Sequence, residues 1–126
     1  MYSAKLLDHF EHPRNSGVVE HPSATVQLEN PVCGDVLRLS AKLAQGRIVE
    51  IRFQAKGCVP AMACGSAVTE LAHEKSIADA ARIRKDDIVN HVGGVPEAST
   101  HAAQLAADAL TNLAKELASL STVSKE

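Results

Sequence analysis

The sequence has very few aromatic residues: two Phe, one Tyr and no Trp among 126 residues. A core must therefore be built mainly from Ala, Val, Leu and Ile. No apolar run approaches the roughly 20 residues of a membrane-spanning helix, and charged and polar residues follow Met1 at once, which is not a signal-peptide pattern. From the short apolar runs and this N-terminus we expect no membrane partner and a cytoplasmic location. The net charge is −2 and the sequence has no basic stripe, so we expect no nucleic-acid partner.

Disulfides are not needed at this size, because a chain of 126 residues buries most of its apolar surface without them. With 45% apolar residues, we expect a single domain over residues 1–126. The three cysteines are an odd number and lie at positions 33, 58 and 64. In a reducing compartment such thiols are core fillers, metal ligands or redox groups.

Residue periodicity predicts an α+β fold. The first helix is capped by Ser3, carries an apolar stripe of Leu6, Leu7 and Phe10, and is stopped by Pro13. Apolar and polar residues then alternate, which predicts three strands with one buried and one wet face, over 24–29, 37–43 and 50–56. Gln45-Gly46 is a hairpin signal.

Helical periodicity follows Gly57, and Pro60 suits the first turn of a helix. Three more helices are predicted beyond it: 76–83 capped by Ser76, 85–92, and a long one from Thr100 to Leu120, followed by a polar, frayed tail over 121–126. We therefore predict a three-stranded antiparallel sheet with helices packed on one face.

Two cysteines and an aspartate stand in loops next to predicted strands. Cys33 and Asp35 precede the second strand, and Gly34 between them allows a sharp turn. Cys58 follows the third strand at a helix N-terminus, which is expected to lower its thiol pKa. Because a hairpin brings the start of one strand beside the end of its partner, Cys33 and Cys58 are predicted neighbours. A metal centre is the leading interpretation, with no turnover of a small-molecule substrate.

The candidate ligands could instead have purely structural roles. Cys33 and Cys58 could be buried apolar fillers, and Asp35 could cap a turn. His101, in the first turn of the last helix, could be an ordinary surface or core histidine, because spacing alone indicates a ligand only weakly. The remaining histidines show no ligand spacing and are interpreted as surface residues: His9, His12, His21, His73 and His91.

The chain resembles the IscU/NifU-type iron–sulfur cluster assembly scaffolds along most of its length. The motifs that carry the resemblance run in the family's order: Tyr2-Ser3, Asp8-His9, Glu11 to Asn15, Cys33-Gly34-Asp35, Gly57-Cys58, Ala63 to Glu70, Ser76 to Ala80, and His101 ahead of Leu105 to Leu110. The family's fold agrees with the α+β architecture predicted from periodicity.

The resemblance implies a transient [2Fe–2S] cluster or iron, with zinc possible, bound by Cys33, Asp35, Cys58 and His101. It also implies a cysteine desulfurase as sulfur donor and apo-proteins as acceptors. Ala102 stands where the family has its third ligand cysteine. The segment 93–99 lacks the Leu-Pro-Pro-Val-Lys-like stretch, with Ser99 at the expected lysine, so we do not expect a dedicated heat-shock chaperone.

Three hypotheses for function remain. The leading one is a scaffold-like protein, not an enzyme, that binds metal or a cluster and receives sulfur. The second is a zinc-binding regulator of the desulfurase that assembles nothing, which Ala102 favours. A zinc hydrolase is weakest, because no general base is marked beside an open metal position. Cys64 is either a buried filler or, if the loop bends, a further ligand or sulfur acceptor.

Overall fold

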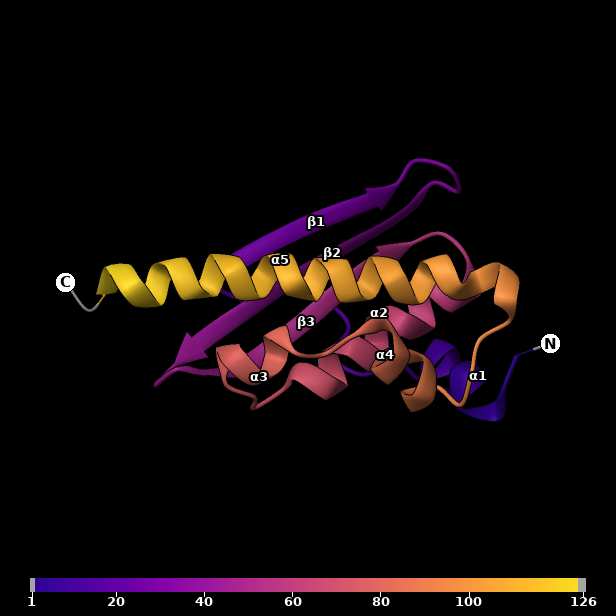
Figure 1. Cartoon of the computed structure of the whole chain (residues 1–126), viewed down its shortest axis with the longest axis horizontal. Coiled ribbons are helices and arrows are strands. Elements are labelled where there is room, and N and C mark those ends of the chain that lie inside the picture. The colour runs from indigo at the N-terminus through magenta and orange to yellow at the C-terminus, as the bar shows by residue number, and fades with distance from the viewer. Residues whose placement is uncertain (1, 125–126) are drawn as a thin grey trace.

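The structure is a computed structural model that describes residues 2–124, with side chains described as far as residue 120. It contains a layer of helices packed against one sheet, and the long helix α5 runs along the whole length of the molecule (Figure 1). The elements are α1 (Ala4–Glu11), β1 (Ala24–Asn30), β2 (Asp35–Ala44), β3 (Arg47–Lys56), α2 (Val59–Ala72), α3 (Ile77–Ala81), α4 (Lys85–His91), the 3-10 helix η1 (Glu97–Ser99) and α5 (Thr100–Ser124).

The sheet has the strand order β1-β2-β3, and both strand pairs are antiparallel. The predicted turn joins β2 to β3, with positive φ at both Gln45 (53°) and Gly46 (75°). Two consecutive residues of positive φ define the turn whose twist matches that of paired strands. The α+β prediction is therefore confirmed, including the hairpin that relates the loops before β2 and after β3.

One face of the sheet is buried beneath α2 and α5, as the alternation of residues predicted. Leu37 and Leu39 of β2 and Ile51 and Phe53 of β3 are at most 4% exposed, and α5 contacts β1 and β2 while α2 contacts β3. Alanine replaces the missing aromatic bulk on the helices, and these alanines are fully buried: Ala63, Ala67, Ala72, Ala103, Ala106 and Ala109. Small side chains let the helices approach the sheet closely.

The other face is not uniformly wet, which corrects the sequence prediction. Ser40 of β2 lies among the polar positions yet is 2% exposed. The segment between α1 and β1 covers it: the N–H of Val19 donates to Ser40 Oγ at 2.9 Å. The same segment exchanges backbone hydrogen bonds with the edge of β3, since Phe53 N–H donates to Asn15 O and Gly17 N–H donates to Phe53 O. The connection between α1 and β1 therefore protects a strand edge.

Helix α1 begins as predicted, but its buried stripe differs. Ser3 Oγ accepts from the N–H of Leu6 at 3.0 Å and donates to the carbonyl of Val92, which ties the helix start to the end of α4. Leu6 is buried, whereas Leu7 is 39% exposed and His9 is only 5% exposed. The interpretation of His9 as a surface residue is wrong, because positions 6 and 9 share the helix face that packs on α2.

Helix α5 continues to Ser124, so its end lies four residues beyond the predicted end at Leu120, and residues 125–126 of the predicted tail lie outside the described part. The short helices begin as expected, since Ser76 Oγ accepts from Asp79 N–H at 3.1 Å. Within residues 2–124 we find no helix that combines the length and apolar character needed to cross a bilayer.

A substitution at Gly65 can test how closely α2 packs on the sheet. A Cβ atom there would lie 2.7 Å from Phe53 Cδ2 and 3.1 Å from Leu37 Cδ1. In an open helix, Gly→Ala stabilises by up to about 1 kcal/mol. Here we expect overpacking to reverse the sign, so that Gly65→Ala lowers the free energy of unfolding by about 1–3 kcal/mol in urea denaturation. An unchanged or higher stability would show that this contact is loose.

Candidate metal centre

The buried carboxylate of Asp35 lies at the centre of the candidate site. Asp35 is the first residue of β2 and is 1% exposed. Its Oδ1 accepts a hydrogen bond from the backbone N–H of Cys58 at 3.2 Å, across the β2–β3 pair. A buried carboxylate needs such partners, because burial without them is costly. The register of the hairpin therefore places Asp35 directly beside the start of α2.

Gly57 leaves the space that this carboxylate occupies. A Cβ atom at Gly57 would lie only 2.1 Å from Asp35 Oδ1, and the φ of Gly57 is +139°. Both the close approach and the backbone conformation require glycine. Sequence reasoning attached no role to Gly57, although its position directly before Cys58 is a signal that could have suggested one.

Cys33 lies in the exposed turn between β1 and β2. The turn is held by Asn30, whose backbone carbonyl accepts from Gly34 N–H at 2.7 Å and whose side-chain oxygen accepts from Val32 N–H at 3.1 Å. Gly34 has a φ of +73°, as the sharp turn requires. Asn30 thus performs the turn-capping role considered for Asp35, and the Asp35 side chain points to the site instead.

Cys58 occupies the N-cap position of α2 without a capping hydrogen bond from its side chain, and its Sγ lies 3.5 Å from Asp35 Oδ2. The expectation of a lowered pKa is wrong. Burial raises the pKa of the Cys58 thiol above its ordinary value, and the neighbouring Asp35 carboxylate raises it further, although the N–H of Ala61 acts in the opposite direction. Desolvation and a like charge outweigh the helix terminus here. Without a metal ion the Cys58 thiol donates to Asp35.

His101 approaches the same carboxylate from the first turn of α5. Its Nε2 lies 3.4 Å from Asp35 Oδ2. This nitrogen is buried, and it has no hydrogen-bond partner among the described residues. A buried polar atom without a partner calls for an explanation, and a bound ion is one of them.

The ligand atoms of Cys33, Asp35 and His101 all lie within 4.8 Å of one another. The structure therefore brings three of the four predicted site residues close to one another, whereas Cys58 lies beside Asp35 but outside that group of three. The four residues come from the β1–β2 turn, the start of β2, the N-terminus of α2 and the first turn of α5. Zinc–sulfur bonds of about 2.3 Å and zinc–nitrogen bonds of about 2.0 Å suit the group of Cys33, Asp35 and His101 after small side-chain adjustments, and the Cys58 side chain would have to turn towards them to join.

Cys64 and Ala102 lie on buried helix faces. Cys64 is 0% exposed, and burial together with the nearby Cys58 thiol raises the pKa of Cys64 to about 12. This environment suits the apolar-filler interpretation of Cys64. Ala102, next to His101 in α5, is 1% exposed and packs in the core.

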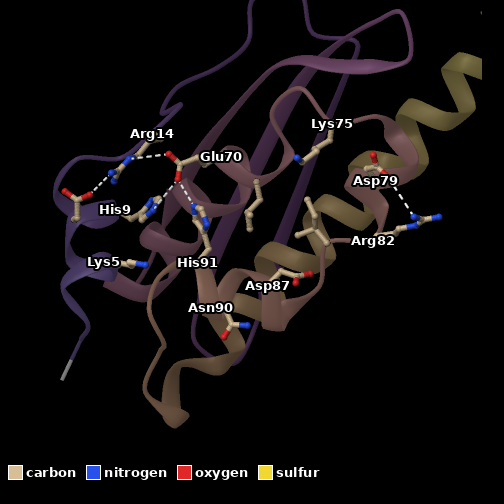
Figure 2. Close-up of a pocket in the computed structure, with 13 residues that line it drawn as sticks. Lys5, His9, Arg14, Glu70, Lys75, Asp79, Arg82, Asp87, Asn90 and His91 are labelled. Carbon is tan, nitrogen blue, oxygen red and sulfur yellow. Dashed lines mark hydrogen bonds and ion pairs between the residues drawn. The ribbon is translucent and has the colours of Figure 1, made fainter.

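A second group of possible ligands was missed by the sequence reasoning. His9, Glu70 and His91 come from α1, α2 and α4, and their ligand atoms also lie within 4.8 Å of one another (Figure 2). The separations along the chain give no ligand spacing, because three helices must pack before these side chains meet. His91 is half-buried and His9 buried, so neither is the plain surface residue that was predicted.

Comparison with known proteins identifies the class of domain. The family described as NifU-like N terminal domain matches residues 1–120. The chain belongs to this family, which confirms the resemblance to IscU/NifU-type scaffolds.

Two relatives of this chain are named as iron-sulfur cluster assembly scaffold proteins. The chain is 43% identical over 110 residues to iron-sulfur cluster assembly scaffold protein IscU 1 of Archaeoglobus fulgidus, an alignment that covers 87% of this chain and 72% of the relative. It is 36% identical over 111 residues to the scaffold protein IscU of Aquifex aeolicus, with 86% and 71% covered.

Solved structures agree on the fold. A NifU-like N-terminal protein from Brucella abortus superposes with a TM-score of 0.77 at 15% identity, covering 93% of this chain and 94% of that one. A scaffold protein for the SUF system from Fervidobacterium islandicum gives 0.67 at 18% identity, with 86% and 93% covered. At these identities the likeness concerns the fold alone.

The raised pKa of Cys58 gives a testable pH dependence. Asp35→Asn removes the negative charge that opposes the Cys58 thiolate while keeping a side-chain oxygen for the Cys58 N–H. We expect the thiol pKa to fall, with burial still holding it above the ordinary value, so that alkylation of Cys58 accelerates at a lower pH. Mass spectrometry of the Cys58 peptide after iodoacetamide treatment of chelator-stripped protein measures this rate against pH.

Glu29→Gln is the control for that experiment, because Glu29 is an exposed carboxylate on neighbouring β1. It should leave the Cys58 profile in place. A profile that moves upward or stays unchanged in Asp35→Asn would show that the carboxylate does not act on the thiol.

Proposed function

We propose that this chain is an iron–sulfur cluster assembly scaffold that holds iron, or a transient [2Fe–2S] cluster, at Cys33, Asp35, Cys58 and His101. The observation that carries the proposal is the convergence of these side chains on one buried carboxylate, with His101 Nε2 left without a hydrogen-bond partner among the described residues. Membership of the NifU-like family and relatives named as IscU scaffolds support it.

The donor set suits temporary binding of such cargo. Two thiolates, one carboxylate oxygen and one imidazole nitrogen make four ligands, and clusters accept imidazole in place of some thiolates. Fewer thiolates bind a cluster less firmly, and a scaffold must release what it holds. Asp35 and Cys58 are held by regular structure, whereas Cys33 stands on an exposed turn. The exposed turn offers the route by which sulfur arrives and the cluster leaves.

Sulfur would come from a cysteine desulfurase, and apo-proteins would accept the finished cluster. Cys33 is the exposed thiol of the three cysteines, while Cys64 is fully buried. A protein partner can therefore reach Cys33 without opening the fold. We assign the role of first sulfur acceptor to Cys33, because Ala102 stands where the family resemblance implies a third cysteine.

A zinc-binding regulator of the desulfurase is the second candidate, and Ala102 favours it. Residue 102 lies beside His101 in α5, and alanine there supplies no ligand atom. Zinc is satisfied by four mixed ligands, so the remaining set suffices for a closed zinc site. On this alternative the chain would bind the desulfurase and zinc but would build no cluster.

Reconstitution with a cysteine desulfurase, cysteine and ferrous iron separates the two candidates. A scaffold should develop the visible absorption of a cluster and pass it to an apo-ferredoxin. A regulator should show no cluster absorption under these conditions, and in a parallel titration with Zn²⁺ it should bind zinc at the Asp35 centre. The second result would overturn the proposal.

Single substitutions of the exposed and half-buried cysteines test the assignment of ligands. We expect Cys33→Ser and Cys58→Ser each to abolish cluster formation, because each removes one of only two thiolates. Cys64→Ala is the matched control, since this buried thiol is not assigned as a ligand, and it should retain cluster formation. Anaerobic absorption spectra with iron and sulfide analysis provide the measurement. Equal loss in all three variants, or none in Cys33→Ser and Cys58→Ser, would contradict the assignment.

A further inference from the structure

A second group of imidazole and carboxylate side chains lies at the far end of α2 from Cys58. Glu70 is twelve residues beyond Cys58, which is about 18 Å along a helix axis. Around Glu70 gather His9 from α1 and His91 from α4, at one end of an open pocket of about 840 Å³ (Figure 2). The group is therefore separate from the Asp35 centre.

His9 and His91 each point their Nε2 atom towards Glu70 Oε1. His91 Nε2 is hydrogen-bonded to Glu70 Oε1 at 2.6 Å, and His9 Nε2 lies 3.6 Å from the same oxygen. The second distance is too long for a hydrogen bond. No hydrogen bond to His9 Nε2 is found within the described residues, although His9 is only 5% exposed. His9 Nε2 thus faces a carboxylate oxygen without a hydrogen bond to it, and this nitrogen keeps some contact with solvent.

The opposite nitrogen of His9 is held in place. His9 Nδ1 lies 2.8 Å from Ser66 Oγ, and the same Oγ accepts from the backbone N–H of Arg14 at 2.9 Å. Metal-bound histidines commonly use their second nitrogen in this way, which fixes the ring orientation. The hydroxyl of Ser66 can accept from a protonated Nδ1, which leaves the lone pair of Nε2 available.

Charges around the group are compatible with a cation. Arg14 pairs with Asp8 at 2.5 Å, and its Nε lies 3.7 Å from Glu70 Oε2. The guanidinium therefore orients the carboxylate through one oxygen and leaves the other, Oε1, towards the imidazoles. Burial lowers the pKa of His9, which favours the neutral imidazole that binds metals.

We propose that His9 Nε2, Glu70 Oε1 and His91 Nε2 form a second metal site, which binds a divalent transition-metal ion of the zinc type. Two imidazoles and one carboxylate are a set that zinc and other first-row divalent ions accept, with a further position open. Ligand atoms of a tetrahedral site with bonds of about 2.0–2.1 Å stand about 3.4 Å apart. His9 and Glu70 already match this separation, and His91 must give up its hydrogen bond and move back slightly.

The three side chains lie at the wall of a pocket that is lined by residues of α1, α2, α3 and α4. Water, or a side chain of a partner protein, would complete the coordination there. The Asp35 centre contributes no ligand to this second site, so the inference does not depend on the proposed function.

Zinc titration of a chain without the first centre's thiolates tests the proposal. In Cys33→Ser/Cys58→Ser protein we expect isothermal titration with Zn²⁺ to retain one bound ion per chain. Adding His91→Ala should weaken that binding at least tenfold, because one of three protein ligands is lost. His73→Ala is the matched control: His73 is exposed, is bonded to Val49 O, and lies outside the group, so its loss should leave the affinity unchanged. Failure of saturable binding, or an equal effect of both histidine substitutions, would overturn the proposal.

Paramagnetic Co²⁺ gives a second measurement that needs no substitution in the site. Substoichiometric Co²⁺ added to the Cys33→Ser/Cys58→Ser protein should broaden the imidazole proton signals of His9 and His91 first. The signals of His21 and His73 serve as internal references, since both are exposed. Broadening confined to His101, or equal for all imidazoles, would show that no site exists at Glu70.

Discussion

The burial of the Asp35 carboxylate is the constraint on which the candidate centre depends. Its oxygens lie against the N–H and thiol of Cys58 and the imidazole of His101, in a space that Gly57 leaves open. These contacts join the start of β2, the N-terminus of α2 and the first turn of α5. A change in the register of the β2–β3 hairpin, or in the docking of either helix, would separate the groups. The chemistry of the site is thus inseparable from the packing of the sheet.

Helix α2 links the two groups of possible ligands. Cys58 stands at its N-terminus and Glu70 in its last turn, while the residues between are largely buried against the sheet and α5. Glycine and alanine on the buried face allow this close packing, which is how a chain with almost no aromatic residues forms a dense core. Because Cys58 and Glu70 stand on one packed helix, the positions of these two possible ligands are fixed more closely than they would be on loops.

Part of the candidate site was predictable from local pattern. Alternating residues and the Gln45-Gly46 turn indicate a hairpin, and the hairpin places the start of β2, with Asp35, beside Cys58 at the end of β3. The thiol environment was not predictable in this way. A helix N-terminus favours a thiolate, but the opposing effects of burial and of the Asp35 charge appear only when the carboxylate is seen beside Cys58. Likewise, sequence separation says nothing of His9 and His91, which meet through three packed helices.

The sequence by itself determined the order of the elements, the hairpin, the helix caps at Ser3 and Ser76, and the membership of the NifU-like family. These depend on periodicity, on short-range hydrogen bonds and on motifs that are contiguous in the chain. Only the tertiary structure decided that segment 15–19 covers β3 and Ser40, that His9 is buried, and that Gly57 makes room for Asp35. Each of these features depends on which surfaces of the elements face each other after packing. Local sequence patterns do not determine that arrangement, because it involves residues far apart in the chain.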